Sequence, residues 1–416
     1  MEPHDNDVLI TGVATATSLG VNNAELMQRL VDKQFGLTSI GGTDAGLDIA
    51  NVGLIDRGHP CFTEIRKRGV PEFLPQVLIH TIKDLIEDAG IEDELRGLDE
   101  TPIILGSCYG STPNYQRLFS VFKDKNKSGL ALRVVEEELY SLKFREDATT
   151  RKMQDFFGLR FAKLVVGAQC ASSITAISLA CSMIRNGAAG LVLVGAFDLF
   201  EAFTYTMARE QGLVDADVCK PFDKRHAGVN FADGVGFLVL ESRKHCQHRG
   251  HSKVYGLIKS CSVGSYPEPG IRAPTFKGIV STIESAMEDA RLRPADFDLI
   301  SAHANGLPDM DRNECISLLR VFGKLAKEIP IVSYVSNVGY SFAGSGMIDI
   351  AVALNCMRES RVIAPLFPES PMDAFSDFNF ATGDHQHRNI DHILKIKLSF
   401  NGTTGALVIS RFPQGE

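Results

Sequence analysis

Short apolar runs rich in β-branched residues alternate along this sequence with longer stretches whose apolar residues recur at helical spacing. The first pattern is typical of buried strands, and the second of helices with one apolar face. The runs expected to be strands are 8–13, 102–105, 163–166, 191–194, 237–240, 299–302, 329–333, 393–398 and 406–410, and those expected to be helices are 78–89, 174–184, 279–290, 314–322 and 347–357. This alternation predicts an α/β protein with mainly parallel or mixed sheets.

The two halves of the chain show the same local order of elements. Residues 163–186 and 329–358 each pass from a strand through a turn of small residues into a helix, which indicates an old duplication. Between the halves, residues 243–253 (RKHCQHRGHSK) have no apolar period and mark the best boundary. We therefore expect an N-terminal unit of residues 1–250 and a C-terminal unit of residues 251–416.

The composition argues against several classes of function. The chain has 416 residues, of which 44% are hydrophobic and 23% charged, so it can bury a large core. Its net charge of -8 argues against a sequence-independent grip on nucleic acid or on an anionic membrane. No apolar run has membrane-spanning length, and the acidic start does not resemble a signal peptide. We expect a cytoplasmic protein without membrane insertion, with the charged segment 123–152 as a surface insertion.

The cysteines give no sign of a disulfide framework or a metal site. There are nine of them, an odd number, and they are scattered. None forms a CxxC pair or a Cys/His cluster with zinc spacing. Each cysteine is therefore considered on its own, and no bound metal is expected.

Cys170 lies in the sharpest local feature of the sequence. Residues 165–173 read VVGAQCASS and precede apolar residues at 174, 177, 181 and 184, so Cys170 falls at a turn between a strand and a helix. Backbone N–H groups at a helix start favour a thiolate and can hold the oxyanion of a thioester under attack. The segment is equally compatible with a small buried cysteine that fills the turn. A cysteine hydrolase of the α/β type is disfavoured, because Ala168 and Ser172 stand where such enzymes need glycine.

A second candidate is His303, which follows the strand expected at 299–302. Residues at the ends of parallel strands project into the ligand crevice of open α/β sheets, so this histidine is suited to acid/base or hydrogen-bonding work. Asp311 and Glu314 lie three residues apart on one face of the next helix. They fit carboxylates that support the site, but a solvated helix face is the commoner explanation.

Two segments rich in small residues complete the set. Residues 332–346 (VSNVGY and SFAGSG within them) precede a helix, and residues 399–405 (SFNGTTG) join two strands. Their glycines suggest a close approach of backbone or ligand, although each could be an ordinary tight turn.

In order and spacing, these four segments resemble the condensing-enzyme family, the β-ketoacyl-carrier-protein synthases of type II fatty acid and polyketide pathways. The resemblance spans nearly the whole chain. It includes the start (9–12 and 18–20), the central signature KPFD at 220–223 with DGVG at 233–236, and Pro308, Asp311 and Glu314 in register behind His303.

The resemblance implies a duplicated thiolase-like fold of five layers, αβαβα, with two mixed sheets, that dimerises through strands near the active site. It also implies roles for single residues. Cys170 matches the nucleophile of the family, His303 its first histidine, and Phe400 the gate whose N–H, with that of Cys170, forms the oxyanion hole. Asn305, Asp311, Glu314 and Asn337 match positions that support the site.

Several positions depart from the family pattern. Tyr340 stands at the second catalytic histidine, and Val335 at the lysine five residues earlier. Asn305 and Leu307 replace the two threonines that hold the pantetheine arm, and Ala232 replaces a small glycine. The Tyr340 hydroxyl can donate one hydrogen bond to a developing enolate, but it is a poor base at neutral pH because its reference pKa is about 10.

Three functions follow from the resemblance. The first is a β-ketoacyl-carrier-protein synthase with a Cys170–His303–Tyr340 site, acylated from a carrier-protein thioester and condensing with a malonyl unit. The second is a non-catalytic subunit like a chain length factor, paired with an active ketosynthase. The third is a thioester-dependent acyltransferase without condensation. All imply acyl carrier protein as partner, phosphopantetheine as the substrate carrier rather than a resident cofactor, and a homodimer or a heterodimer with another ketosynthase.

Overall fold

The computed structural model describes residues 4–41, 49–109, 146–251, 253–267 and 273–413. The surface insertion expected at 123–152 falls largely outside these ranges. Only its end is described, where helix α7 (Glu146–Phe157) begins.

One ladder of ten strands runs through the molecule in the order β10-β9-β13-β14-β8-β1-β7-β6-β4-β5. Five strands come from the first half: β1 (Val8–Thr17), β4 (Thr101–Gly106), β5 (Phe161–Val166), β6 (Leu191–Asp198) and β7 (Gly234–Ser242). The other five come from the second half: β8 (Gly256–Ser265), β9 (Leu299–Ser301), β10 (Ile331–Val332), β13 (His392–Leu398) and β14 (Thr403–Ser410).

The two sets of five strands repeat one topology. In the first set, β5, β4 and β6 are parallel to one another, and β7 and β1 follow in antiparallel pairs. In the second set, β10, β9 and β13 are parallel, and β14 and β8 follow in antiparallel pairs. The duplication expected from residues 163–186 and 329–358 is therefore present in the sheet topology.

The two mixed sheets expected from the resemblance are these two sets, but they are joined at one end. Strands β1 and β8 pair over only three positions, from Val8–Ile258 to Ile10–Gly256, and then diverge. The hydrogen-bond ladder is therefore continuous, although the two sets face each other across a helical layer.

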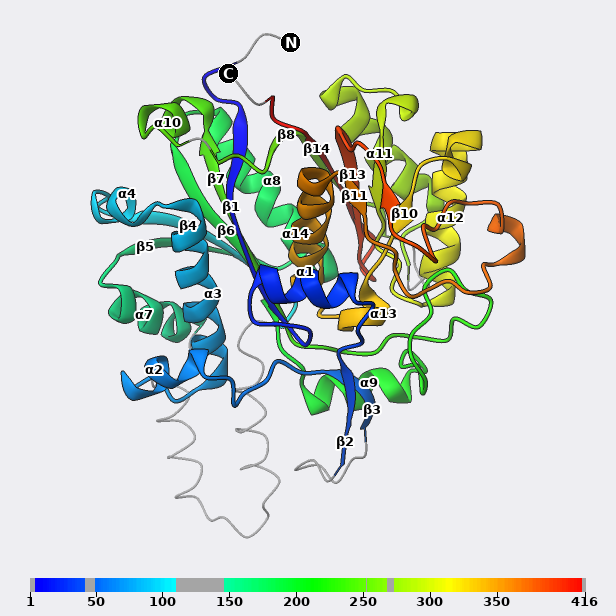
Figure 1. The fold of residues 1–416 in the computed structure, drawn as a ribbon, viewed down its shortest axis with the longest axis horizontal. Coiled ribbons are helices and arrows are strands. Elements are labelled where there is room, and N and C mark those ends of the chain that lie inside the picture. The colour runs from blue at the N-terminus through cyan, green and yellow to red at the C-terminus, as the bar shows by residue number, and fades with distance from the viewer. Residues whose placement is uncertain (1–3, 42–48, 110–145, 252, 268–272, 414–416) are drawn as a thin grey trace.

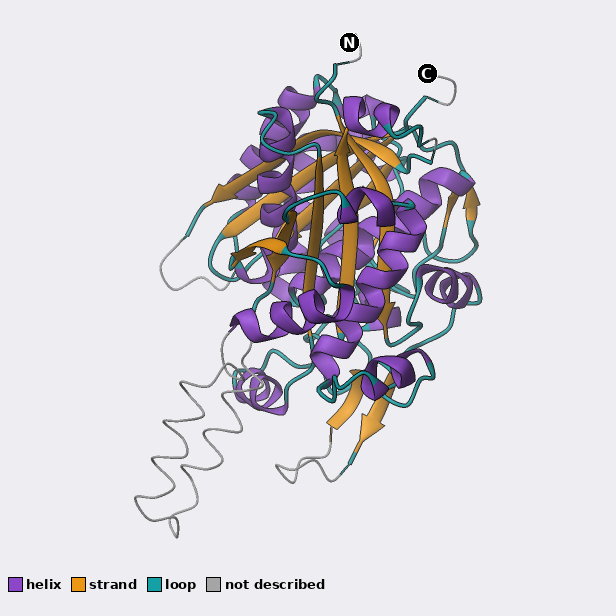
Figure 2. Cartoon of the chain, turned by 90° about the vertical axis from the view of Figure 1, so that its left-hand side faces the viewer, coloured by secondary structure: helices purple, strands orange, loops and turns teal. Residues whose placement is uncertain are grey.

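Helices complete five layers, seen from left to right in Figure 1. Helix α3 (Phe73–Ala89) covers the outer face of the first sheet. Helices α8 (Ser172–Arg185) and α14 (Ala343–Glu359) pack against each other between the sheets. Helices α11 (Phe276–Ala290) and α12 (Pro308–Phe322) cover the second sheet. The expected αβαβα order is confirmed, and Figure 2 shows the strands enclosed by helices in a second view.

The remaining elements are short and lie around this frame. They are α1 (Asn23–Val31), β2 (Leu37–Ile40), β3 (Ile49–Gly53), α2 (Cys61–Lys67), α4 (Glu92–Arg96), η1 (Gln169–Ala171), α9 (Ala202–Glu210), α10 (Arg243–His248), η2 (Pro294–Asp296), η3 (Gly323–Lys327), α13 (Val335–Val338), β11 (Arg361–Val362), η4 (Asp373–Phe375) and β12 (Gln386–His387).

A glycine sets the distance between the two central helices. A Cβ atom added at Gly346 on α14 would lie 2.1 Å from the hydroxyl oxygen of Ser173 on α8. A larger residue would displace the Ser173 hydroxyl and press against its Cβ at 3.0 Å, which explains part of the small-residue density at 332–346.

The segment 243–253, expected as the boundary between the halves, has regular structure at its start. It begins with helix α10, capped by the Ser242 hydroxyl. Its Arg249 and His245 both contact the buried carboxylate of Glu241. Polar side chains of this segment thus compensate the buried charge of Glu241 at the end of β7. Strand β8, which the sequence did not predict, starts just after this segment.

Candidate active site

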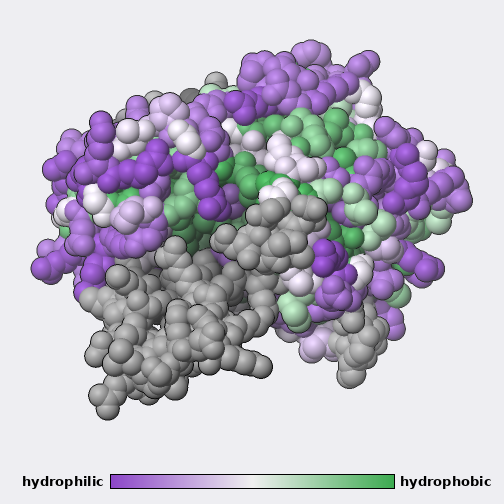
Figure 3. Space-filling model, turned by 90° about the horizontal axis from the view of Figure 1, so that it is seen from below, coloured by the Kyte–Doolittle hydropathy of each residue, from purple (hydrophilic) through white to green (hydrophobic). Residues whose placement is uncertain are grey.

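The strands that carry the candidate residues end at the lower end of the molecule in Figure 1. Parallel strands end at the same edge of a sheet, so β4, β5 and β6 in one set, and β9 and β13 in the other, deliver their following loops to one region. Figure 3 looks at this end and shows apolar surface gathered between polar margins.

Cys170 occupies the turn that the sequence predicts. Strand β5 ends at Val166, the turn η1 spans Gln169–Ala171, and α8 begins at Ser172. Gln169 adopts a left-handed conformation with φ of 49°, which makes the turn sharp. The Ser172 hydroxyl accepts a hydrogen bond from the Ala168 N–H at 2.8 Å and donates one to the Gln169 carbonyl at 2.6 Å. Ser172, which replaces the glycine of a hydrolase elbow, therefore holds the turn.

His303 is fully buried in the loop after β9. Its backbone N–H and that of Ala304 donate to the two carboxylate oxygens of Glu314, at 2.7 and 2.8 Å. Neither ring nitrogen of His303 has a hydrogen-bond partner among the described residues. The carboxylate therefore fixes the loop and leaves the imidazole free to bind another group.

Asp311 and Glu314 are both fully buried, so a solvated helix face is the wrong explanation for them. Asp311 accepts hydrogen bonds from the N–H of Gly306 at 3.2 Å and of Phe222 at 2.8 Å, and it contacts the His226 ring at 3.0 Å. The carboxylates on α12 hold the loop that carries His303 through these hydrogen bonds.

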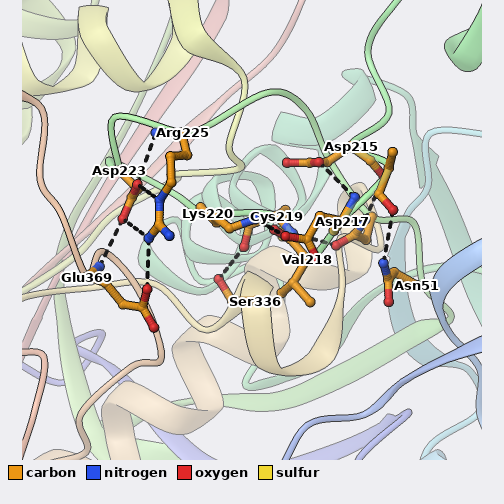
Figure 4. Close-up of polar contacts among 12 residues, drawn as sticks. Asn51, Asp215, Asp217, Val218, Cys219, Lys220, Asp223, Arg225, Ser336 and Glu369 are labelled. Atoms are coloured by element: carbon orange, nitrogen blue, oxygen red, sulfur yellow. Dashed lines mark hydrogen bonds and ion pairs between the residues drawn. The ribbon is translucent and has the colours of Figure 1, made fainter.

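The segment after Asp215, part of which is seen in Figure 4, is bonded to this loop, since the Gly228 N–H donates to the Gly306 carbonyl at 3.1 Å. Asp223 of the KPFD signature forms two hydrogen bonds with the Arg225 side chain, at 2.8 and 3.0 Å, and Arg225 reaches Glu369. The Ser336 hydroxyl donates to the carbonyl of Cys219 at 2.8 Å. These contacts tie the central signature to the helix before Tyr340.

Tyr340 lies beside His303, with ring centres 5.7 Å apart and an interplanar angle of 87°. Its backbone N–H donates to the Asn230 carbonyl at 2.7 Å, which fixes the main chain. Its hydroxyl is fully buried and makes no hydrogen bond of good geometry among the described residues. The hydroxyl lies close enough to Cys170 to affect the ionisation of that thiol. Cys170, His303 and Tyr340 are therefore brought together.

The other predicted positions differ in placement. Asn305 is fully buried, and its side-chain oxygen accepts from the Leu307 N–H at 3.2 Å. Asn337 donates from its side chain to the Gln34 carbonyl at 3.1 Å, so it fastens a neighbouring loop. Phe400 is partly buried and packs against the core cluster that contains Cys170.

Sequence analysis did not identify a second cysteine, Cys108, as part of the site. The Cys108 thiol, in the loop after β4, lies close enough to Cys170 to affect the ionisation of that thiol. Asp198, at the end of β6, accepts hydrogen bonds from the Cys108 and Tyr109 N–H groups at 3.0–3.1 Å and from the Ala343 N–H at 3.0 Å. This carboxylate joins the Cys108 loop to the start of α14. The sequence signal that could have identified this position is an acidic residue, Asp198, at the end of an apolar strand.

Sequence analysis also did not identify two buried lysines on β13 as part of the site. Lys395 and Lys397 are both fully buried. The Lys395 nitrogen lies 2.6 Å from the carboxylate of Asp349 on α14, and Lys397 donates to the hydroxyl of Ser345 on the same helix. Lysines that alternate with apolar residues ordinarily indicate a solvent face, so the sequence gave no sign of their burial.

The ionisation of the site follows from these contacts. The pKa of the Cys170 thiol lies below its ordinary value because Cys108 and Tyr340 can donate to the thiolate and Lys397 supplies positive charge, against the opposing effect of burial. Burial and the nearby lysines hold the pKa of His303 well below 6.5, so the imidazole is neutral. Burial raises the pKa of Tyr340 well above 10, so its hydroxyl stays protonated. The site offers one nucleophile and two neutral hydrogen-bonding groups.

This fold defines a thiolase-like protein with a buried cysteine, Cys170, at its strand-to-helix turn. The family model "Beta-ketoacyl synthase, N-terminal domain" matches residues 5–245, and its C-terminal counterpart matches residues 255–367. The chain therefore belongs to the β-ketoacyl synthase family.

Individual relatives agree with this assignment. The tetracenomycin polyketide synthase ketoacyl synthase alpha subunit of Streptomyces glaucescens is 23% identical over 347 residues, which cover 81% of this chain and 80% of the relative. A type II polyketide ketosynthase solved with its acyl-carrier protein has a TM-score of 0.86 at 18% identity, covering 98% of this chain and all (100%) of that one. The ishigamide ketosynthase/chain length factor has a TM-score of 0.82 at 18% identity, covering 99% and 100%.

None of the helices in the described ranges combines the length and apolar character that a membrane-spanning helix needs.

Proposed function

We propose that this protein is a β-ketoacyl-acyl-carrier-protein synthase of a type II polyketide or fatty acid pathway, with an altered site of Cys170, His303 and Tyr340. The observation that carries the proposal is the meeting of a thiol of lowered pKa with two neutral buried hydrogen-bonding groups, drawn from both halves of the fold. Membership of the β-ketoacyl synthase family supports the same reaction class.

In the first half-reaction the Cys170 thiolate attacks the thioester carbonyl of an acyl chain carried on phosphopantetheine. The new carbon–sulfur bond forms as the bond to the pantetheine sulfur breaks, and the proton released from Cys170 goes to the leaving thiolate. The backbone N–H groups of Cys170 and Phe400 are the proposed donors to the oxyanion. A lowered thiol pKa raises the thiolate fraction at neutral pH and so favours this step.

In the second half-reaction a malonyl thioester loses carbon dioxide. The electron pair of the broken carbon–carbon bond passes to the thioester carbonyl and gives an enolate, whose oxygen can accept hydrogen bonds from Tyr340 and from an N–H of His303. The enolate carbon then attacks the acyl group on Cys170 and releases the thiolate. Neither Tyr340 nor His303 needs to change its charge, which suits their pKa directions.

Acyl carrier protein is the proposed partner, since the substrates of such a reaction travel on its phosphopantetheine. One of the similar structures is a ketosynthase with its acyl-carrier protein, which supports this partner. A second chain is also proposed, either a copy or another ketosynthase. Strand β5 ends the ladder, and its Leu164 and Val165 are 45% and 44% exposed, as a pairing edge would require.

A chain-length-factor-like subunit is the second candidate. The replacement of the second family histidine by Tyr340, together with Asn305 and Leu307 at pantetheine positions, favours this function, and a similar structure is a ketosynthase/chain length factor. Retention of both Cys170 and His303 favours a catalytic role instead. Acyl transfer from Cys170 without condensation is the third candidate.

The test incubates the purified protein with acyl-carrier protein and then malonyl-carrier protein, and follows intact mass and product. A mass increase that is absent in Cys170→Ala, followed by β-ketoacyl product from this protein alone, is expected. A stable adduct without product would replace the proposal with the acyltransferase. Product that requires a partner ketosynthase and survives Cys170→Ala would replace it with the non-catalytic subunit.

A further inference from the structure

One face of strand β13 points into the site. Side chains two residues apart in a strand share a face, so Lys395, Lys397 and Ser399 project the same way. Lys395 meets α14, Lys397 meets α14 one turn earlier, and the Ser399 hydroxyl donates to the side chain of Gln169 at 3.0 Å. Gln169 is the residue before Cys170. This face therefore approaches the turn that holds the nucleophile.

Lys397 lies between Tyr340 and the start of α14. Its nitrogen is 5.0 Å from the centre of the Tyr340 ring and donates to the Ser345 hydroxyl. No carboxylate forms an ion pair with it among the described residues, since Asp349 pairs with Lys395. Asp349 stabilises the ammonium without pairing with it, and a buried ammonium that lacks an ion-pair partner is still costly, so a second negative group nearby stabilises it further.

We propose that Lys397 is a positioning residue whose ammonium group is the counter-charge of the Cys170 thiolate. Cys170 is the anionic centre of the site once it loses its proton. Lys397 lies over the Tyr340 ring, and Ser399, two residues further along, contacts Gln169 beside Cys170. The two charges favour each other: Lys397 lowers the pKa of the thiol, and the thiolate raises that of the ammonium. This assignment rests on Cys170 as the nucleophile of the proposed function. The site therefore has a lysine, Lys397, although Val335 stands at the position of the lysine in the family pattern.

The other charged and titratable groups do not replace Lys397. Lys395 is neutralised by Asp349, and His303 is uncharged. Asp198, whose pKa burial raises to about 6, disfavours the thiolate when ionised. The groups that face Cys170 or Lys397 are Cys108 and Tyr109 after β4, Asp198 on β6, His303 after β9, Glu314 on α12, Tyr340 before α14, Asp349 on α14 and Lys395 on β13.

Burial lowers the pKa of Lys397 to about 8. The ammonium form therefore still predominates at neutral pH. Pairing with a thiolate requires that the lysine holds its proton while the cysteine has lost its own, and the lowering of the Cys170 pKa acts in that direction.

The test measures the ionisation of Cys170 in the full-length protein. The rate of alkylation by iodoacetamide is followed against pH, and the mass of the Cys170 peptide is read separately from that of Cys108. The wild type is expected to show an apparent pKa below the ordinary thiol value of about 8.5. In Lys397→Met this pKa should rise by about one unit, so that alkylation at neutral pH slows about tenfold.

Two matched variants separate charge from packing. Lys397→Arg keeps the charge and should retain a low Cys170 pKa. Ser345→Ala removes the hydrogen bond to Lys397 but keeps its charge, so it should leave the Cys170 pKa unchanged. Equal Cys170 pKa values in folded Lys397→Met and wild type would overturn the proposal, because a merely structural lysine would not affect this titration.

If Lys397→Met does not fold, the wild type and Lys397→Arg can still be used to test the proposed ion pair. The ultraviolet absorbance of the thiolate, taken as the difference between wild type and Cys170→Ala, gives the Cys170 pKa directly. A value at or above about 8.5 in the wild type would reject the ion pair. Alkylation needs no carrier protein, so it tests the ion pair separately from condensation. A protein that shows the paired thiolate but forms no condensation product would reject only the proposed function.

Discussion

At the scale of single residues, the proposed site combines a cysteine at the family position with neighbours that depart from the family pattern. Cys170 and His303 occur where the resemblance expects them, whereas Tyr340 supplies a hydroxyl in place of an imidazole. Lys397 contributes a positive charge from strand β13, whereas the family position, where Val335 stands, lies at the start of helix α13. The sequence showed that the lysine is absent at position 335, but it could not show that Lys397 takes its place, because Lys397 is distant along the chain.

Tyr340→Phe tests the role of the hydroxyl. Loss of one hydrogen-bond donor to an enolate should lower the rate of condensation by about 10²- to 10³-fold, while acylation of Cys170 continues. Product formation and intact mass measure the two steps separately. Tyr334→Phe is the matched control, because Tyr334 is also buried but donates to the Ile363 carbonyl at 2.8 Å. Equal losses of condensation in the two variants would remove Tyr340 from the reaction.

Glu314 gives the protein a defined dependence of stability on pH. Burial raises the pKa of its carboxyl to about 7, although the His303 and Ala304 N–H groups oppose this. Because the folded pKa is above the unfolded value of about 4.3, this contribution is full at low pH and is lost as pH rises through about 7. Relative to Glu314→Gln, the wild type should lose about 2–3 kcal/mol between about pH 4 and pH 8.

Urea unfolding at a series of pH values measures that difference. Glu284→Gln, at an exposed position on α11, is the control and should run parallel to the wild type. A constant difference between wild type and Glu314→Gln across this range would mean that Glu314 does not change its ionisation on folding.

At the scale of elements, the sequence predicted the type of most strands and helices but drew them short. The helix expected at 314–322 begins at Pro308, and the strand expected at 237–240 extends over Gly234–Ser242. Their missing ends hold polar or small residues, such as Asp311 and Gly236, whose place in a regular element is set by burial and by neighbouring strands. Strand β8 was missed because its apolar period is weak.

The crossing of α8 and α14 is sensitive to substitution. In Gly346→Ala, the new methyl group would meet the Ser173 hydroxyl at 2.1 Å and its Cβ at 3.0 Å, so the hydroxyl must rotate away and the packing tightens. We expect a loss of about 1–3 kcal/mol in the free energy of unfolding. Ser173→Ala combined with Gly346→Ala should recover part of it, as denaturant unfolding of the three variants would show. An undiminished loss in the double variant would place the strain elsewhere.

At the scale of the whole molecule, the two halves share one core. Ile177 and Val194 from the first half and Ile350 and Leu407 from the second belong to one continuous cluster of buried side chains. The site is shared as well, since Cys170 comes from one half and His303 and Tyr340 from the other. The units 1–250 and 251–416 remain a prediction about sequence organisation, but neither contains a complete site.

The chain should therefore unfold as one unit. It has no tryptophan and 8 tyrosines, so tyrosine fluorescence reports tertiary structure and far-ultraviolet circular dichroism reports secondary structure. The two signals should change together along a denaturant gradient. Residues 1–250 alone should lack a cooperative transition, because α8 would expose the side that packs on α14. Two separate transitions in the full chain would indicate halves that fold independently.

The sequence alone determined the fold class, the duplicated order of elements, the turn at Cys170 and the loop of His303, because each depends on local spacing along the chain. Tertiary structure decided the burial of four charged residues whose type and local pattern are typical of solvated positions: Asp311, Glu314, Lys395 and Lys397. It also decided the pairing of Lys397 with a site built from distant segments. A local pattern records which face of an element is apolar, whereas the ionisation of a buried group depends on charges that only the folded chain brings near it.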